Sequence, residues 1–290
     1  MALLFPVAAA ADTTAADLRV DGKVLRDMSN GEKFMPRGVN WPSFEYACVQ
    51  GWGYSNMEAT PETVQAMLDR NINTVRIPLN QDCWLGDDGQ PVSAFPDPDL
   101  TVPGYQAAVE DFVNELIDEG MAVVLDLHWT GRPGSVADGL RPMRDQRSDD
   151  FWTSVATRFR DNPSLMFDLF NEPHSHWNPA IEDWDFVLSW NCRVAGGCTA
   201  PDQPDTDPVI NGTTYSTMGL EQLLAAVRKT GATQPVILSG LDYANDLSGW
   251  LQFRPADGQL VAGFHNYPEN SAADKPAEKR RSPKSRARFP

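Results

Sequence analysis

Six polar side chains fall in the last half of four apolar segments of the sequence, where β-strands are expected to end. They are Arg76, His128, Asn171, Glu172, His265 and Tyr267. A carboxyl group among imidazole and phenol donors can give a proton to a substrate and take it back, which is general acid–base chemistry. A nearby arginine favours the ionised form of a carboxyl group. These residue types predict an acid–base site with Glu172 as its carboxyl group.

Each of these residues has a plainer interpretation when it is taken alone. A single inward histidine is more often a hydrogen-bonded core residue, and a single arginine in a strand more often forms a structural ion pair. The agreement of six polar side chains at one edge favours a functional site over core filling. Asp126 and Asp168 lie deeper in their segments, so we expect them to be structural partners.

The segments that carry these side chains are short, apolar and rich in branched residues, which is typical of buried strands. Six are predicted, over residues 34–41, 73–79, 122–129, 165–173, 235–240 and 260–267. Helical patterns lie between them, at 60–70, 105–120, 150–160 and 219–231. This alternation predicts parallel strands with crossover helices, an α/β sheet or barrel whose carboxyl ends share one rim.

Within the second segment, the two-residue period of a strand separates the side chains. Val75, Ile77 and Leu79 should face the helices, and Arg76 should point inward. Ahead of the first segment, turns at Asp21-Gly22 and Asn30-Gly31 predict a small hairpin that caps one end of the sheet.

The segment LMFDLFNEPH at 165–174 resembles the signature of glycoside hydrolase family 5, the cellulase family. RGVNW, NTVRIPL, LDLHW and HNY occur around it in the family's order. The resemblance implies a (β/α)8 TIM barrel over residues 17–270 that cleaves β-linked glucan or mannan with retention of configuration. It also implies that Glu172 is the general acid/base and that Asn171 contacts the sugar 2-hydroxyl. The supporting side chains would be Arg76, His128, His265 and Tyr267.

Tryptophan rings in loops after candidate strands could stack on sugar faces. The candidates are Trp41, Trp52, Trp84, Trp129 and Trp177. A single tryptophan is nevertheless found in a core more often than on a binding platform.

The sequence departs from the family at the second carboxylate. A retaining glycosidase needs a nucleophile about 5–5.5 Å from the acid, and in relatives it follows the seventh strand. Only Glu269 and Glu278 come after Tyr267, and neither lies in an apolar segment. We therefore assign the nucleophile to no residue. The expectation is a chain cut short after six of eight strands and inactive by itself. A non-catalytic carbohydrate-binding relative is the alternative.

Both ends of the chain differ from its body. Residues 1–16 contain the apolar run ALLFPVAAA and small residues after it, which resembles a secretory signal without its basic start; a disordered apolar leader is the other interpretation. Residues 271–290 are rich in arginine, lysine, proline and serine, and we expect a disordered basic tail. The sequence thus predicts a secreted protein.

Composition narrows the range of partners. The chain has 24 Lys+Arg against 40 Asp+Glu, a net charge of -16, which argues against a nucleic-acid binder. Its apolar runs are shorter than the roughly 20 residues that cross a bilayer, so no membrane association is expected. The expected partner is a β-linked polysaccharide or oligosaccharide, and no motif indicates a metal or an organic cofactor.

The chain contains 4 cysteines, an even number that fits disulfide pairing outside the cytosol. Cys48 and Cys83 follow the first and second strands, hence lie in adjacent loops of one rim, so we pair them. Cys192 and Cys198 would then close a short loop within a polar insertion at about 191–214.

Overall fold

The computed structural model describes residues 15–86, 97–131, 136–203 and 212–267. Most of the expected leader, the expected tail, Glu269 and Glu278 lie outside these ranges. In the part of the chain that the structure describes, no helix is both long enough and apolar enough to cross a membrane.

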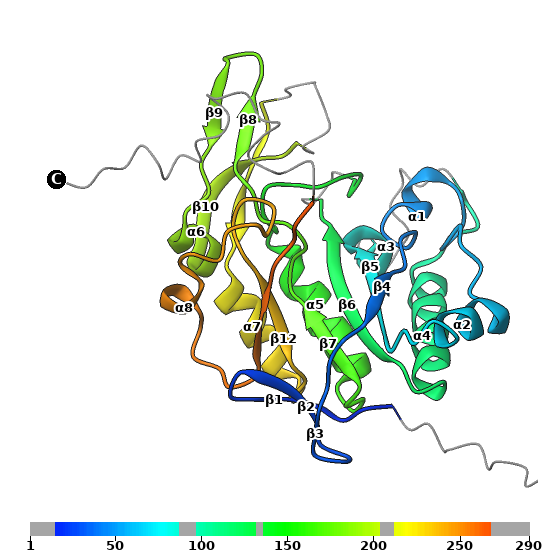
Figure 1. Cartoon of the computed structure of the whole chain (residues 1–290). Helices are drawn as coiled ribbons and strands as arrows, with labels where there is room; N and C mark the ends of the chain where they lie inside the picture. The colour runs from blue at the N-terminus through cyan, green and yellow to red at the C-terminus, as the bar shows by residue number, and fades with distance from the viewer. Residues whose placement is uncertain (1–14, 87–96, 132–135, 204–211, 268–290) are drawn as a thin grey trace, which may run out of the picture.

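The described residues contain a six-stranded parallel sheet, and its strands are those predicted from the sequence. In chain order they are β4 (Gly38–Asn40), β5 (Thr74–Asn80), β6 (Ala122–Trp129), β7 (Leu165–Asp168), β12 (Val236–Ser239) and β13 (Leu260–Gly263). Their order across the sheet is β13-β12-β7-β6-β5-β4, so each strand pairs with the preceding one. Together with the helices they form an incomplete (β/α)8 barrel (Figure 1).

The four predicted helices are confirmed and cover one face of this sheet. They are α2 (Pro61–Leu68), α4 (Val102–Asp118), α5 (Arg147–Phe159) and α7 (Leu220–Lys229). The side chains of Thr60 and Thr101 cap α2 and α4, each of which has proline in its first turn. Such signals are local, which explains why the sequence located these helices.

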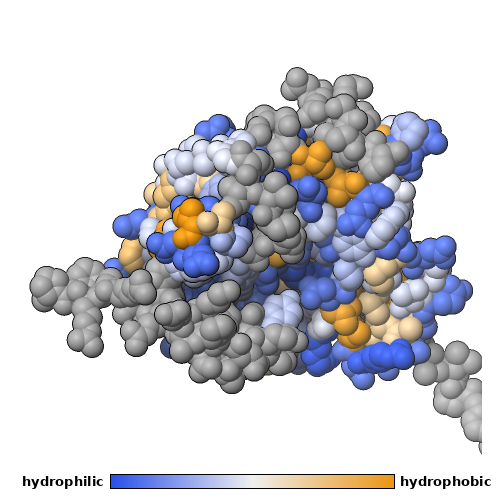
Figure 2. Space-filling model, turned by 90° about the horizontal axis from the view of Figure 1, so that it is seen from above, coloured by the Kyte–Doolittle hydropathy of each residue, from blue (hydrophilic) through white to orange (hydrophobic). Residues whose placement is uncertain are grey.

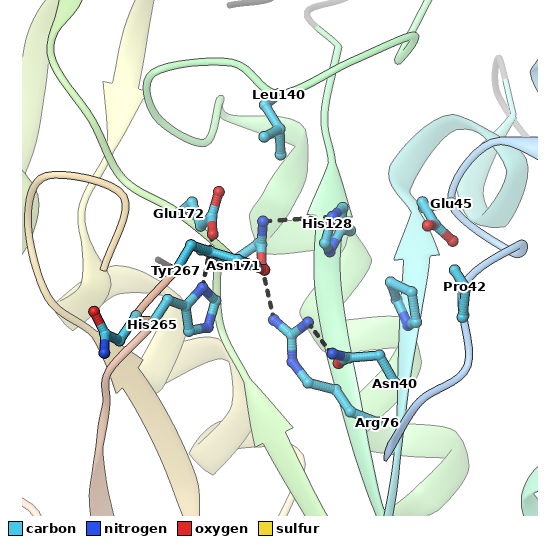
Figure 3. Close-up of a pocket in the computed structure, with 12 residues that line it drawn as sticks. Asn40, Pro42, Glu45, Arg76, His128, Leu140, Asn171, Glu172, His265 and Tyr267 are labelled. Carbon is cyan, nitrogen blue, oxygen red and sulfur yellow. Dashed lines mark hydrogen bonds and ion pairs between the residues drawn. The ribbon is translucent and has the colours of Figure 1, made fainter. Parts of the chain in front are cut away.

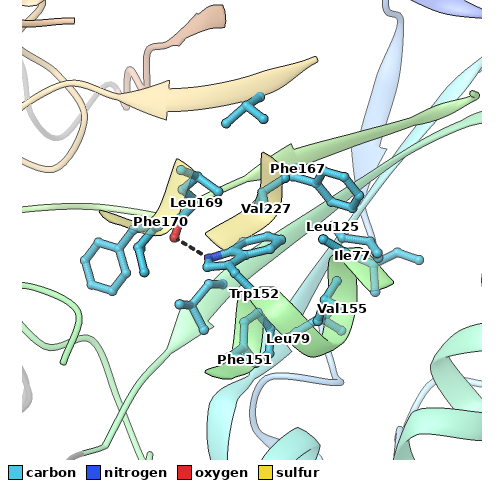
Figure 4. Close-up of a cluster of buried hydrophobic side chains, with 14 of the residues drawn as sticks. Ile77, Leu79, Leu125, Phe151, Trp152, Val155, Phe167, Leu169, Phe170 and Val227 are labelled. Carbon is cyan, nitrogen blue, oxygen red and sulfur yellow. Dashed lines mark hydrogen bonds between the residues drawn. The ribbon is translucent and has the colours of Figure 1, made fainter. Parts of the chain in front are cut away.

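A hydrophobic core joins the helices to the sheet, as the period of β5 predicted. Ile77 and Leu79 are fully buried there, and Trp152 of α5 packs among them (Figure 4). The indole N–H of Trp152 also donates to the carbonyl oxygen of Leu169 at 3.0 Å. Since Leu169 lies two residues before Asn171 in the segment that follows β7, this bond anchors that segment to the core.

The predicted hairpin caps the sheet, as expected. It comprises β1 (Leu18–Asp21) and β2 (Val24–Asp27), and β3 (Glu32–Lys33) adds a third antiparallel strand that the sequence analysis did not predict. Leu18 packs against Val124 and Met166, side chains of the sheet face opposite the helices, in a second hydrophobic cluster. Its N–H donates to the carbonyl oxygen of Pro163 at 3.0 Å, just before β7. The hairpin therefore closes the end of the barrel where the strands begin.

Two further hairpins stand above the other end of the strands (Figure 1). They are β8 (His176–Asn178) with β9 (Asp183–Phe186), and β10 (Gly196–Pro201) with β11 (Thr214–Met218). The sequence did not predict them, because these short polar strands lack a continuous apolar run.

Both predicted disulfides are present, and short helices carry three of the four cysteines. These helices are α1 (Ala47–Gln50), α3 (Gln81–Leu85) and α6 (Trp190–Ala195); a further short helix, α8 (Trp250–Phe253), follows β12. Cys48 and Cys83 join α1 to α3, and Cys192 and Cys198 join α6 to β10. The first bond therefore links the loops that follow β4 and β5.

Candidate active site

A pocket of about 630 Å³ opens at the carboxyl ends of the strands. Figure 2 views this end of the molecule from above and shows hydrophilic side chains in the hollow between the grey segments. The lining residues are Asn40, Pro42, Glu45, Arg76, Pro78, His128, Leu140, Asn171, Glu172, His265, Asn266 and Tyr267 (Figure 3). The structure thus brings together the six polar side chains with which the sequence analysis began.

Arg76 lies at the base of this pocket between two buried carboxylates. Its Nη2 atom is 3.0 Å from Oδ2 of Asp126 and 3.0 Å from Oδ2 of Asp168. Burial opposes the charge of Arg76, but the two carboxylates outweigh it and raise the pKa of the guanidinium group. For Asp168, burial outweighs the attraction of Arg76 and raises the pKa of the carboxyl group. Both aspartates are structural partners, as expected.

His128 and Asn171 extend this network to the floor of the pocket. His128 Nδ1 lies 2.6 Å from Oδ2 of Asp126, so it donates to that carboxylate and leaves Nε2 as an acceptor. Asn171 Nδ2 lies 3.4 Å from this Nε2 atom, while Asn171 Oδ1 accepts from Arg76 Nη2 at 2.8 Å. The amide of Asn171 is therefore oriented by a partner at each end.

Glu172 follows Asn171 and is held by His265, which lies just after the last strand of the sheet, β13. Its Oε1 atom lies 2.8 Å from Nδ1 of His265. The residue is 9% exposed and lines the pocket. One carboxylate oxygen thus has a fixed partner, and the carboxyl group stays accessible from the pocket.

The loop after β12 fixes both members of this pair. The N–H of Tyr243 donates to the carbonyl oxygen of Pro173 at 3.1 Å, and its ring stacks on His174 at 4.4 Å. The N–H of His265 donates to the carbonyl oxygen of Ala244 at 3.1 Å. Asp242, Tyr243 and Ala244 have φ values of 56°, 58° and 61°, a conformation that costs an L-residue roughly 1–2 kcal/mol. The strained residues 242–244 make the contacts that position Glu172 and His265.

No pattern in the sequence indicates this loop. Left-handed residues are expected at glycine and, less often, at asparagine or aspartate, and Tyr243 and Ala244 are none of these. The conformation is imposed by contacts with Pro173, which lies 70 residues earlier in the chain, and with His265.

The predictions for Trp41 and Trp84 need correction. Trp41 is 4% exposed and packs against Phe112 with ring centroids 4.9 Å apart, so it belongs to the core and not to the pocket. Trp84 is also buried in the core, because α3 turns it toward α4 and α5. Trp129 lies 6.3 Å from the ring of Tyr46, which lies 5.9 Å from Trp52. Trp52 is 54% exposed.

The hairpin β8–β9 carries the remaining candidate. Trp177 packs edge-on against Trp184 at 5.5 Å, outside the residues that line the pocket. At the pocket itself, Tyr267 contributes an aromatic ring that is 51% exposed.

Sequence reasoning missed a second carboxyl group in the pocket. Glu45 lines it from the loop after β4, and burial raises the pKa of its carboxyl group against the opposing hydrogen bond from Ser43. The loop has no strand pattern to indicate that this side chain faces inward. Among the described residues, no group of three histidine, cysteine or acidic side chains is placed to hold a metal ion.

The model of the cellulase family, glycosyl hydrolase family 5, matches residues 28–288. The chain belongs to this family. The matched region contains all of the pocket residues, so the Asn171-Glu172 pair and its neighbours lie within a glycosidase domain.

Curated relatives are similar at low identity. Endoglucanase 1 of Saitozyma flava is 24% identical over 279 residues, which cover 86% of this chain and 76% of that protein. Endoglucanase A of Ruminococcus albus is 27% identical over 187 residues, which cover 59% of this chain and 46% of that protein. The match therefore spans less than half the length of the second relative.

Solved structures show the same fold. A β-glucanase from Saccharophagus degradans in complex with cellotetraose has a TM-score of 0.57 at 19% identity, covering 95% of this chain and 68% of that one. A hyperthermophilic endocellulase from Pyrococcus horikoshii has a TM-score of 0.58 at 17% identity, covering 90% and 74%. These similarities confirm the barrel architecture of the family 5 glycosidases.

Proposed function

We propose that this chain is an endo-acting, retaining glycosidase domain for β-linked glucan or mannan, with Glu172 as its general acid/base. The observation that carries the proposal is the 2.8 Å contact of the Glu172 carboxyl group with His265 at the edge of the pocket, next to Asn171. A carboxyl group with one fixed oxygen and one face toward the pocket can deliver a proton to the oxygen of a glycosidic bond.

The chemistry begins with a sugar chain bound across the pocket. Glu172 protonates the leaving glycosidic oxygen as the bond to the anomeric carbon breaks and positive charge develops on the sugar ring. The hydrogen bond between Asn171 and the 2-hydroxyl of that sugar becomes stronger as this positive charge develops. Because Arg76 and His128 fix both ends of the Asn171 amide, no reorientation is needed at that moment.

Glucan is the favoured substrate class. Two curated relatives are endoglucanases, and a structure of similar fold holds cellotetraose. Exposed aromatic rings at Trp52 and Tyr267 offer faces on which sugar rings can stack. We further propose secretion, with residues 1–16 as the leader, 17–270 as the catalytic domain and 271–290 as a disordered tail; the two disulfides support an oxidising compartment.

The nucleophile remains assigned to no residue, and the 290-residue chain alone is proposed to turn over β-glucan at background level. Glu172 can protonate the leaving oxygen, but the same carboxyl group cannot also form the glycosyl-enzyme intermediate, and we assign that role to no other carboxyl group, Glu45 included. Sequencing the encoding DNA past the codon for Ser271 tests truncation: a downstream reading frame with a strand that ends in glutamate supports it, and its absence from every frame contradicts it. A non-catalytic sugar-binding relative is the second candidate, supported by the same pocket.

The experiment that separates binding from catalysis uses one preparation of the full 290-residue chain. Titration with cellotetraose should give saturable binding, and a reducing-sugar assay on β-glucan should stay at background. Sustained hydrolysis by the pure protein would contradict the inactivity proposal, and an E269Q variant would then test Glu269. Absence of binding would contradict the function itself.

The role of Glu172 can be tested without the missing nucleophile. Azide supplies an external nucleophile for the anomeric carbon of an aryl β-cellobioside: a C–N bond forms, the C–O bond breaks, and Glu172 protonates the departing aryloxide. With a poor leaving group, glycosyl azide formation should fall about 100-fold or more in E172Q. With an aryloxide whose conjugate phenol is strongly acidic, departure needs no protonation, so the wild type and E172Q should react at similar rates. If E172Q reacted as fast as the wild type with both substrates, Glu172 would be ruled out as the acid.

A further inference from the structure

Glu45 reaches the pocket from the wall opposite Glu172, and the chemistry described so far leaves it unused (Figure 3). The residue is 6% exposed. A buried carboxyl group is costly unless its oxygens are hydrogen-bonded. Oε2 accepts the backbone N–H of Ser43 at 2.7 Å, and the backbone N–H of Glu45 itself is a second donor to the carboxyl group. A carboxylate can accept about four hydrogen bonds, so these two backbone donors leave acceptor sites on the pocket side for a ligand.

The loop that carries Glu45 is held rigidly. The carbonyl oxygen of Glu45 accepts from Nδ2 of Asn80 at 2.8 Å, and Asn80 is fully buried at the end of β5. Ser43 has a φ of 140°, a conformation that a serine keeps only when its surroundings impose it. The disulfide between Cys48 and Cys83 ties the same loop to α3. The carboxyl group is thus fixed before any ligand arrives.

Asn40 lines the same wall and complements Glu45. Its Oδ1 atom accepts from Nη1 of Arg76 at 3.4 Å, which leaves the Nδ2 amide group as a donor toward the pocket. Asn40 therefore offers a donor and Glu45 an acceptor. A sugar hydroxyl both donates and accepts, so this pair of groups matches it.

We propose that Glu45 and Asn40 form a subsite for the sugar adjacent to the ring cleaved at Glu172, and that Glu45 determines which hydroxyl orientation this subsite accepts. The inference rests on the proposed function and deepens it. A fixed acceptor discriminates between sugars, because a ring whose hydroxyl points elsewhere leaves the buried carboxyl group without its partner. Burial, which raises the pKa of Glu45, adds to that cost.

The test compares two tetrasaccharides that differ in the orientation of the 2-hydroxyl, cellotetraose and mannotetraose. Their dissociation constants are measured by calorimetry on the full chain for the wild type, E45Q and E58Q. Glutamine keeps an oxygen for the N–H of Ser43 but replaces the other oxygen with a donor. Glu58 is the matched control, since it is exposed on the same connection between β4 and α2 and does not line the pocket.

In E45Q, we expect the dissociation constant of cellotetraose to rise about tenfold and that of mannotetraose to rise less, so that their ratio changes severalfold. E58Q should match the wild type. A general loss of folding would weaken both ligands together and leave the ratio unchanged. If the wild type binds both sugars and a folded E45Q, checked by circular dichroism, keeps the wild-type ratio, the role of Glu45 alone is overturned. If the wild type bound neither sugar, the proposed function would fail as well.

Discussion

Arg76 under the pocket and Arg193 beside the end of β12 are both embedded in the protein, yet their partners differ in kind. Arg76 forms ion pairs with Asp126 and Asp168, and its side chain keeps 18% of its surface exposed. Arg193 is fully buried, and its Nε atom donates to the carbonyl oxygen of Ser239 at 2.6 Å. In the part of the chain that the structure describes, Arg193 forms no ion pair with a carboxylate.

The neighbour of Arg193 repeats its pattern. Arg144 is fully buried and donates from Nε to the carbonyl oxygen of Met218 at 2.9 Å and from Nη2 to that of Arg193. Burial lowers the pKa of Arg193 to about 9 and also lowers that of Arg144, whereas carboxylates raise the pKa of Arg76. Under the pocket, the positive charge of Arg76 is balanced by carboxylates. In the insertion after β7, Arg193 and its neighbour Arg144 instead donate hydrogen bonds to neutral carbonyl oxygens.

This difference predicts how the free energy of unfolding changes when each arginine is replaced. Replacing Arg76 by methionine should cost about 3–5 kcal/mol of unfolding free energy at pH 8, because two buried carboxylates lose their cation. Burial already raises the pKa of Asp168 in the folded state, and without Arg76 that pKa rises further. Protonation then favours the folded state, so the loss in R76M should shrink as the pH falls from 8 to 5.

Urea denaturation at the two pH values measures this effect, and R76K, which keeps the charge, is the control. An equal loss for R76M at pH 8 and pH 5 would show that packing, and not charge balance, accounts for the stability that Arg76 provides.

Replacing Arg193 by methionine should have a smaller effect, about 1–3 kcal/mol, because a buried neutral carbonyl oxygen loses its donors. No buried carboxylate loses a cation in R193M, so urea denaturation should show the same loss of unfolding free energy at pH 5 and pH 8. A loss that depends on pH in this range would reveal an acidic partner and remove the contrast with Arg76.

Replacement of a surface arginine should give the smallest loss of unfolding free energy of the three. Arg26 contacts Asp21 at 2.9 Å, with side-chain exposures of 32% and 60%. Replacing it by methionine should cost less than about 1 kcal/mol, and added salt should reduce the cost further, since solvent screens exposed pairs. A loss as large as that of R193M would mean that the hairpin at the base of the barrel depends on this pair.

The sequence predicted the sheet well because buried parallel strands are nearly continuous apolar runs. Segments such as 122–129 coincide with a strand of the structure, Ala122–Trp129. It also predicted which polar residues meet, since parallel strands bring their carboxyl ends to one rim. It failed for Trp41, because a residue just past a strand end can turn either to the pocket or to the core. It missed Glu45, whose loop has no periodicity.

The amino-acid sequence by itself determined the order of strands and helices, the inward direction of Arg76 and the presence of an Asn-Glu pair at a strand end. These features follow from patterns a few residues long. Only the tertiary structure decided that Asp126 and Asp168 share Arg76, that His265 holds Glu172, and that residues 242–244 adopt strained conformations to support them. Those contacts join segments up to 93 positions apart, so they exist only once the barrel has brought its strands together.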